Sequence, residues 1–214
     1  MKKNKECFIK YLKKLDLHTD DIEIAFEAYF VGLVETNQYI NLFSRKMDVD
    51  EIWSKHSLDS VSIYELYRDW SGKMVLDFGS GGGLPGMPIK IITPECDMTL
   101  LDSTKKKIEA VRKVINNSLL PNVNFLSCRL EELKIEDAYD IIVSRAVTIT
   151  PAIQKAMIKI LKKNGKIFLY KSEAFEDAKL FRDFRVHNVL EVSNFRELEL
   201  NCLGERRVIE INYG

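Results

Sequence analysis

Apolar residues recur at helical spacing along the first part of the chain. From Asn4 to Leu15 they fall every three or four positions, which predicts an amphipathic helix. Thr19, followed by two acids, is a good helix start, and a second helix is predicted from Ile22 to Glu35. A third helix is predicted to begin near Asp48. This part of the chain is therefore expected to be entirely helical.

The hydrophobic pattern changes after a polar boundary at Asp69–Gly72. Short apolar runs typical of strands now alternate with helical segments. The strand runs are Met74–Phe78, Met98–Leu101, Val123–Leu126, Asp140–Val143 and Lys166–Tyr170. The clearest helical segments are Lys105–Asn116 and Pro151–Leu161, and Gly165 is predicted to end the second of them. Strands that alternate with helices at this interval predict parallel βαβ units.

Two further strand candidates close the chain, Val186–Val192 and Arg206–Ile211, with no good helix pattern between them. A parallel sheet that ends in an antiparallel pair is a mixed, doubly wound α/β sheet. We therefore predict a helical extension over residues 1–70, packed on a main α/β domain over residues 71–214.

The composition is that of an ordinary globular protein, with 46% hydrophobic and 30% charged residues among 214. The formal net charge is zero, so the overall charge neither favours nor excludes a polyanionic partner. The lysines nevertheless gather in three basic segments, over residues 2–14, 105–113 and 155–171. Each segment fits a solvated helix face, and together they are compatible with a surface for RNA.

Cysteine and histidine residues are few and dispersed. Cys7, Cys96, Cys128 and Cys202 show no paired spacing, so neither a zinc site nor a redox pair is expected, and no metal is predicted. Scattered thiols are typical of a reducing compartment. No apolar run approaches the length of a membrane span, and the N-terminal segment lacks the apolar core of a signal peptide. We therefore expect a cytoplasmic protein with no membrane partner.

Half of the glycines lie in one short segment, VLDFGSGGGLPGMP, between Gly79 and Gly86. The segment follows the first predicted strand, and in an open α/β sheet ligands bind beyond the carboxyl ends of the strands. There the backbone must turn sharply and approach the ligand closely, which a Cβ atom would obstruct. The glycine-rich turn therefore predicts a nucleotide-type ligand site, in preference to a turn without a ligand.

Two kinds of ligand fit this turn. The dinucleotide pattern G-x-G-x-x-G is matched from Gly81 to Gly86. An acid followed by G-x-G-x-G, as in S-adenosylmethionine sites, is matched by Asp77, Gly79, Gly81 and Gly83. A pyrophosphate is disfavoured near an anion, whereas a sulfonium ligand with an amino-acid tail carries positive charge. Asp77 therefore favours the second ligand.

Two later strand ends carry further candidate contacts. Asp102, which ends the second predicted strand, can accept hydrogen bonds from both hydroxyls of a ribose, and Ser103 follows it. This acid suits either ligand. Leu130 and Glu131, after the third predicted strand, offer an adenine ring one packed face and one hydrogen-bonding edge. Glu131 also fits an exposed acid at a helix start.

These segments together resemble the glucose-inhibited division protein B family of small-subunit ribosomal RNA methyltransferases. The family pattern D-L-G-S-G-A-G-L-P-G-[IL]-P stands here as DFGSGGGLPGMP, and its L-L-D-S block as LLDSTKKK. The R-x-E block is Arg129-Leu130-Glu131, and the S-R-A block is Ser144-Arg145-Ala146. The N-L and H-x-L-D-S blocks match Asn41-Leu42 and His56-Ser57-Leu58-Asp59-Ser60. The matching blocks stand in the family's order.

The resemblance implies a class I S-adenosylmethionine-dependent methyltransferase of Rossmann-like fold, which methylates N7 of one guanine in 16S ribosomal RNA. It also implies cofactor contacts from Gly79, Leu84, Leu130, Glu131 and Arg145. The chain departs from the family at Gly82, which replaces an alanine. It departs again at Val147, where the family often has phenylalanine, and at Ser172, where the family has glycine. The last two concern the rim that faces the substrate, so they leave the target guanine open.

The residues after the fourth predicted strand fit this chemistry. Enzymes that methylate exocyclic amines commonly carry an Asn/Asp-Pro-Pro-aromatic segment there, and this chain has Val143–Ala146 instead. Carbon methylation of pyrimidines needs a cysteine nucleophile, and Cys128 lies where the adenine is expected. Guanine N7 has an in-plane lone pair and no proton to lose, so in-line methyl transfer needs no general base. Alignment of the reacting atoms then supplies the catalysis.

Arg145 is the candidate for this positioning, through the cofactor, through guanine O6 or through a phosphate. An ion pair with Glu131 or Asp102 is the structural alternative. His56 and Asp59 share a helix face and fit an acid–base pair, but we favour a role in holding the N-terminal helices against the main domain. The candidate RNA contacts are Lys106, Lys107 and Lys171.

Three other functions stay open. A small-molecule methyltransferase is the closest alternative, because zero net charge does not require RNA. A nicotinamide-dependent oxidoreductase fits the dinucleotide pattern but lacks a clear hydride-transfer pair. A non-catalytic RNA-binding or ribosome-assembly factor need not keep so complete a glycine turn. We expect a monomer that acts on small-subunit ribosomal RNA, either naked or in the small-subunit particle.

Overall fold

The computed structural model describes residues 3–116, 122–172, 185–191 and 206–212, and its centre is a seven-stranded sheet. The strands are β1 Met74–Phe78, β2 Asp97–Leu101, β3 Val123–Leu126, β4 Tyr139–Arg145, β5 Leu161–Ser172, β6 Arg185–Glu191 and β7 Arg206–Asn212. Their order in the sheet is β3-β2-β1-β4-β5-β7-β6. Strands β1 to β5 pair in parallel, whereas β7 is antiparallel to both β5 and β6. The predicted doubly wound mixed sheet is confirmed.

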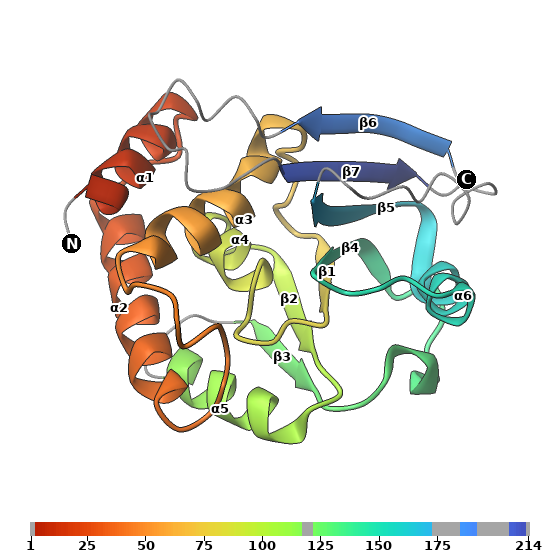
Figure 1. The fold of residues 1–214 in the computed structure, drawn as a ribbon. Coiled ribbons are helices and arrows are strands. Elements are labelled where there is room, and N and C mark those ends of the chain that lie inside the picture. The colour runs from red at the N-terminus through yellow and green to blue at the C-terminus, as the bar shows by residue number, and fades with distance from the viewer. Residues whose placement is uncertain (1–2, 117–121, 173–184, 192–205, 213–214) are drawn as a thin grey trace.

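Helices cover both faces of the sheet (Figure 1). They are α1 Lys3–Lys14, α2 Asp20–Asn37, α3 Asp59–Val61, α4 Gly86–Ile92, α5 Lys105–Asn116 and α6 Pro151–Ile160. Three further helical segments are the π turn η1 Trp53–Leu58 and the 3₁₀ turns η2 Ser62–Glu65 and η3 Leu130–Glu132. In Figure 1, α1 and α2 form an outer layer on one side of the molecule, and α6 lies on the opposite side.

The strands are buried on both faces, and alternate side chains enter two different cores. Val75 and Phe168 belong to the buried cluster that contains the inner faces of α1, α2, α4 and α5. Their chain neighbours Leu76 and Leu169 belong to a second cluster, with residues of η3 and α6. Burial on both faces explains why these strands appear in the sequence as unbroken apolar runs.

The N-terminal helices share the larger core with the α/β part. Phe8 of α1 and Tyr29 of α2 are fully buried, in the same cluster as Met87 of α4 and Val111 of α5. This packing brings N-terminal residues close to the segment that follows β1. The division of the chain at residue 70 stays a prediction.

Two local features of the helices differ from expectation. The third predicted helix forms, but it changes type along its length, from the π turn η1 through α3 to the 3₁₀ turn η2. The prediction that Gly165 ends the helix after β4 is wrong, because α6 ends at Ile160. Asn164, within the strand β5 that follows directly, has a left-handed φ of 63°. Asparagine tolerates this conformation because its short amide can form local hydrogen bonds.

Candidate active site

The glycine turn leaves the carboxyl end of β1 and leads into α4. Gly79, Gly81 and Gly83 all have positive φ angles, of 74°, 54° and 86°. The turn is bound to the end of β2, because the amides of Gly79 and Ser80 both donate to the Leu101 carbonyl, at 2.8 and 3.0 Å. The turn therefore lies at the carboxyl edge of the sheet, where ligands bind in folds of this type.

The segment that follows β4 packs directly on this turn. A Cβ atom at position 79 would lie 2.3 Å from Cγ2 of Val147, so only glycine permits the contact. Ala146, just before Val147, has φ 58°. This conformation costs a residue other than glycine about 1–2 kcal/mol, and such strain tends to occur at functional sites. The residues that follow β1 and β4 therefore share one site.

Asp77 lies beneath the turn and is fully buried. Its Oδ2 atom accepts a hydrogen bond from the Gly86 amide at 2.8 Å, whereas its buried Oδ1 atom has no partner among the described residues. Burial raises the pKa of this carboxyl from 3.8 to about 7, although the Gly86 amide and the Arg145 charge act to lower it. A buried acceptor without a donor is costly, so Oδ1 indicates a place for a donor group of a ligand.

Asp102 holds the same turn from the end of β2. Its Oδ2 atom accepts from the Gly81 amide at 3.0 Å, and its Oδ1 atom accepts from the Thr104 amide at 2.8 Å. Ser103, between these residues, is exposed. Each carboxylate oxygen has a second lone pair, so Asp102 can also accept hydrogen bonds from the hydroxyls of a ligand.

The turn after β3 presents an apolar and a polar residue side by side. Leu130 is buried and Glu131 is exposed, as the predicted packed face and polar edge require. Both line a cavity of about 610 Å³ whose other described walls come from the segment after η3 and from α6, Lys155 among them. The residues of the glycine turn do not line this cavity. Contact of Leu130 and Glu131 with a ligand held by the turn therefore stays a prediction.

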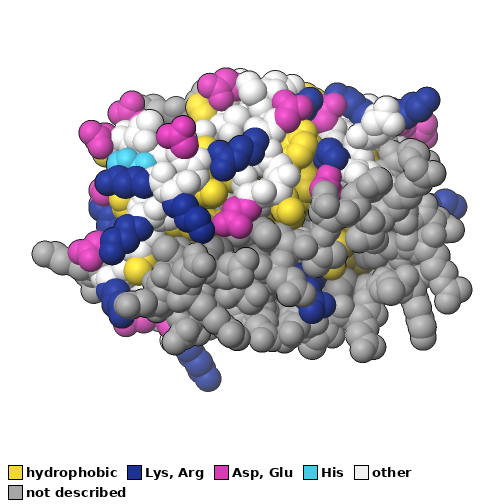
Figure 2. Space-filling model, turned by 90° about the horizontal axis from the view of Figure 1, so that it is seen from above, with side chains coloured by type: hydrophobic (Ala, Val, Ile, Leu, Met, Phe, Trp, Pro, Cys, Tyr) yellow, Lys and Arg dark blue, Asp and Glu magenta, His cyan; other side chains and the backbone are white. Residues whose placement is uncertain are grey.

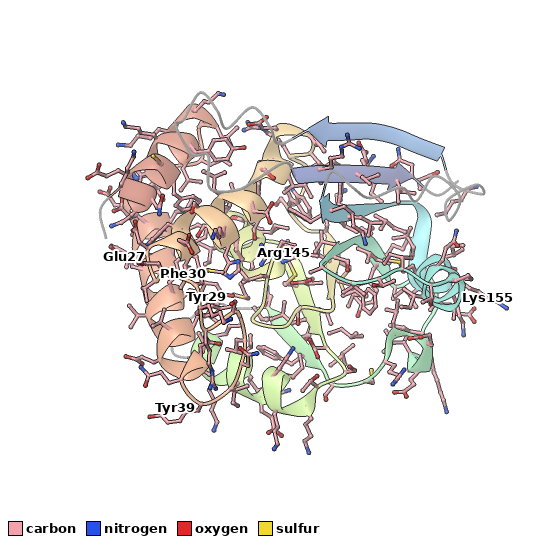
Figure 3. All side chains as sticks on the ribbon, viewed as in Figure 1. Glu27, Tyr29, Phe30, Tyr39, Arg145 and Lys155 are labelled. Carbon is pink, nitrogen blue, oxygen red and sulfur yellow. The ribbon has the colours of Figure 1, made fainter. Side chains whose placement is uncertain are left out.

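Arg145 ends β4 and reaches the N-terminal part of the chain. Its Nη1 atom donates to Oδ2 of Asp59 at 3.1 Å, and its Nη2 atom lies 3.3 Å from Nδ1 of His56. The structure thus shows an ion pair with Asp59, and not the alternatives with Glu131 or Asp102. Figure 3 shows Arg145 in the interior, between the helices of the N-terminal part and the strands.

Tyr29 of α2 also contacts the glycine turn, although no motif marks it in the sequence. The side chain is fully buried, and its Oη atom donates to the Gly82 carbonyl at 2.6 Å. Leu42 lies against the same glycine, with its Cβ atom 3.5 Å from the position of a Cβ at Gly82. The one sequence signal for such contacts was the apolar character of α2 on most of its sides, which indicates a buried helix.

We expect Tyr29→Phe to weaken ligand binding at the turn, because it removes the hydroxyl that holds the Gly82 carbonyl. The free energy of unfolding should fall by about 1–3 kcal/mol, which chemical denaturation measures. Tyr11→Phe is a matched control, since the Tyr11 hydroxyl donates to Glu65 at 2.8 Å away from the turn. That variant should lose stability with unchanged ligand affinity, and equal affinities in all three proteins would contradict a role for Tyr29.

The candidate RNA contacts lie in different environments. Lys106 is exposed and Lys107 is half-buried at the start of α5, close in the chain to Asp102. Lys171 is only 9% exposed, and its ammonium group donates to the Val147 carbonyl at 2.6 Å. The structure therefore shows Lys171 in support of the segment after β4, and its contact with RNA stays a prediction.

Positive charge is offset by acids on part of the described surface. Lys5 forms ion pairs with Glu23 and Glu27, so the acids of α2 offset part of the basic N-terminal segment. On the face shown in Figure 2, lysine and arginine side chains are interspersed with aspartate and glutamate. Of the three basic segments, the one over residues 105–113 adjoins the glycine turn through Asp102.

The thiols of Cys96 and Cys128 are held in their protonated form. Burial raises the pKa of Cys128, and it raises that of Cys96 to about 11, so neither thiol ionises readily. In the described ranges, no group of three His, Cys, Asp or Glu residues is placed to hold a metal ion. Within those same ranges, no helix is long and apolar enough to cross a membrane. What the site offers is backbone amides, two carboxylates and an arginine.

Comparison with known proteins shows what the chain is similar to. The family model described as rRNA small subunit methyltransferase G (GidB) matches residues 22–208. The ribosomal RNA small subunit methyltransferase G of Lachnoclostridium phytofermentans is 36% identical over 176 residues, 79% of this chain and 72% of that protein. The protein of the same name from Christiangramia forsetii is 36% identical over 199 residues, 90% of each chain.

Solved structures show the same fold. A SAM-dependent methyltransferase from Aquifex aeolicus matches with a TM-score of 0.63 and 13% identity, over 84% of this chain and 97% of that one. At this identity the likeness establishes the fold alone, which is that of class I S-adenosylmethionine-dependent methyltransferases. The family model and the relatives above extend over most of the chain, and the chain therefore belongs to the rRNA small subunit methyltransferase G family.

Proposed function

We propose that this protein transfers a methyl group from S-adenosyl-L-methionine to N7 of a guanine in 16S ribosomal RNA. Family membership supports the RNA substrate and the cofactor. The structural observation that carries the proposal is the turn after β1, whose positive-φ glycines lie over Asp77 with Oδ1 lacking a donor among the described residues. A cationic amino-acid ligand suits this oxygen, because it would supply both a donor and a compensating charge.

The described residues fit the cofactor. The turn presents bare backbone, Asp102 keeps lone pairs for hydroxyls, and Asp77 disfavours a pyrophosphate in the same place. When bound, the cofactor supplies a methyl group activated by a sulfonium centre. We assign its binding to Asp77, Gly79, Gly81, Gly83, Leu84, Asp102, Ser103, Leu130, Glu131 and Arg145.

Methylation at N7 requires the protein mainly to align the acceptor atom with the methyl group. Because N7 carries a lone pair and no proton, no residue has to act as a general base. Holding the acceptor in line can lower the barrier by about 7–11 kcal/mol in favourable cases. We assign this positioning to Arg145, whose planar guanidinium can donate to guanine O6 or to a phosphate while Asp59 holds it. The ion pair also argues against Asp59 as a base.

RNA is proposed to approach over the start of α5. Lys106 and Lys107 lie there, next to the strand end that carries Asp102, whereas Lys171 supports the segment after β4. The free thiols of Cys96 and Cys128 accord with a reaction in the cytoplasm. The predicted monomer can be checked by light scattering.

The dispersed charge of Figure 2 favours one second candidate, a small-molecule methyltransferase with the same cofactor. Transfer of labelled methyl to small ribosomal subunits that lack the modification separates the two functions. Naked RNA and a small-molecule extract serve as parallel substrates, and the labelled product is digested to nucleosides. We expect label in 7-methylguanosine from the 16S RNA. The comparison of subunits with naked RNA shows which of them is the substrate.

Unlabelled RNA together with intact cofactor binding would overturn the RNA assignment and favour the small-molecule reaction. Label in another nucleoside would keep the enzyme class and refute N7 as the acceptor atom. RNA affinity should fall steeply with salt, because lysine contacts to phosphates release counterions. If the protein binds a nicotinamide cofactor and does not bind S-adenosylmethionine, the oxidoreductase function is favoured instead.

A further inference from the structure

The ion pair between Arg145 and Asp59 joins the carboxyl end of β4 to the helical N-terminal part. The Asp59 side chain is 3% exposed and the Arg145 side chain 15%, so water has little access to the pair. Arg145 would contact cofactor or acceptor in the proposed function, whereas Asp59 lies in the H-x-L-D-S segment, far away in the chain. A carboxylate buried at this position fixes where the guanidinium lies.

Asp59 is itself held by the structure around it. The Ser62 hydroxyl donates to the Asp59 carbonyl at 2.7 Å, and the Tyr170 hydroxyl donates from β5 to the Ser60 carbonyl at 2.7 Å. Tyr170 lies on β5, the strand next to β4. Its hydrogen bond therefore fixes the helical segment to the same sheet that carries Arg145. The carboxylate therefore has a defined position relative to the end of β4.

The π turn η1 places a second group on the guanidinium. His56 lies within η1 and directs Nδ1 toward Nη2 of Arg145, while its ring packs edge-on against Phe43. π turns are rare and frequently lie at functional sites. Two different nitrogens of Arg145 thus meet two groups of the N-terminal part. An arginine side chain held by two groups has already lost rotational freedom before the substrate binds.

We propose that Asp59 is a positioning residue for methyl transfer, which acts by holding Arg145 in the orientation that the acceptor guanine meets. This inference rests on the proposed function. It makes residues 51–65 of the N-terminal part a component of the active site as well as a support for its fold. Asp59 contacts neither substrate nor reacting atoms in this role, so its removal should act through Arg145 alone.

A double-mutant cycle on kcat/KM for ribosomal RNA methylation tests the proposal. We expect Asp59→Asn and Arg145→Gln each to lower kcat/KM by roughly tenfold or more. The double variant should show no further loss, because each change disables the same arrangement. Assays at saturating RNA and cofactor should show the Asp59→Asn loss in kcat, as expected for alignment of bound reactants. All rates are measured at a temperature well below the thermal unfolding midpoint of every variant.

Asp140→Asn is the matched control. Asp140 lies at the opposite end of β4, where it pairs with Lys162 at 2.9 Å and accepts from the Met74 amide. Its removal should lower stability and leave kcat/KM unchanged. If Asp59→Asn does not fold, Asp59→Glu replaces it, since this variant keeps the charge and displaces the carboxylate by one methylene. We then expect a smaller loss that likewise vanishes in the Arg145→Gln background.

The outcomes distinguish this inference from the proposed function. Native protein that does not methylate ribosomal RNA would refute the function itself. Native activity with losses that multiply in the double variant would refute the coupling and leave the function standing. Full activity of Asp59→Asn, or an equal loss in Asp140→Asn, would equally overturn the role of Asp59.

Discussion

Replacing Gly83 by alanine is expected to abolish measurable cofactor binding and to lower the free energy of unfolding by about 2–5 kcal/mol. Gly83 has φ 86°, and a Cβ atom there would lie 2.8 Å from Cγ of Met87 and 3.0 Å from Oη of Tyr29. Both neighbours are fully buried, so the turn has to move. Calorimetric titration with S-adenosylmethionine measures the loss of cofactor binding, and denaturant unfolding measures the loss of stability.

A substitution at Gly72 distinguishes the effect of backbone strain from that of steric crowding. It has φ 67°, but a Cβ atom there would meet nothing within 4 Å, and it lies before β1, at the opposite end of the strand from the turn. Gly72→Ala should therefore cost about 1 kcal/mol of stability and leave cofactor affinity unchanged. Native affinity in Gly83→Ala would show that the turn is not the cofactor site.

Asp77→Asn is expected to make the protein more stable above neutral pH while weakening cofactor binding by about tenfold or more. The substitution keeps an acceptor for the Gly86 amide, which Oδ2 of Asp77 serves in the native protein. It removes the negative charge that a cationic ligand would need at Oδ1. A gain in stability with a loss of binding is typical of residues kept for function.

The pH dependence follows from the raised pKa of Asp77. Because burial moves it from 3.8 to about 7, the folded protein holds a proton that the unfolded chain has already released between these values. Stability therefore falls as pH rises through this window, by up to about 4 kcal/mol in total. The Asp77→Asn side chain does not ionise, so its contribution should stay level, and unfolding curves at pH 5 and 8 measure the difference.

Binding experiments supply the second half of this test. The affinity of the native protein for S-adenosylmethionine should rise from pH 6 to pH 8 as Asp77 ionises, whereas that of Asp77→Asn should not. Adenosine lacks both the sulfonium and the amino-acid tail, so it should bind the two proteins alike. Parallel stability profiles for the two proteins across pH would contradict the buried charge, and equal cofactor affinities would contradict its role in binding.

Strands and amphipathic helices could be predicted well because their signals are local. Met74–Phe78, Val123–Leu126 and Lys105–Asn116 form with the bounds expected from the sequence. The antiparallel end of the sheet also follows from a local observation, two strand patterns with no helix pattern between them. Alternation of elements then restricts the sheet to few arrangements.

The bounds of helix α4 were not predicted, because it carries no periodic pattern. All residues of Gly86–Ile92 are buried, so its polar position, Lys90, does not mark a solvent face. The Lys90 ammonium instead donates to the carbonyls of Pro94 and Cys96, both at 2.6 Å, just beyond the end of the helix. The hydrogen bonds of this buried lysine depend on the path of the chain from α4 to β2. The spacing of residues in the sequence does not predict that path.

The sequence by itself determined those chemical features that depend on contiguous residues. The glycine turn, the acids that end the strands near it and the mixed, doubly wound type of the sheet were all predictable, because turn geometry and strand burial act over a few positions. The tertiary structure alone decided that Asp59 holds Arg145 and that Tyr29 holds Gly82. Such pairs join distant segments, and their partners are selected by packing against a common core, so local patterns do not identify them.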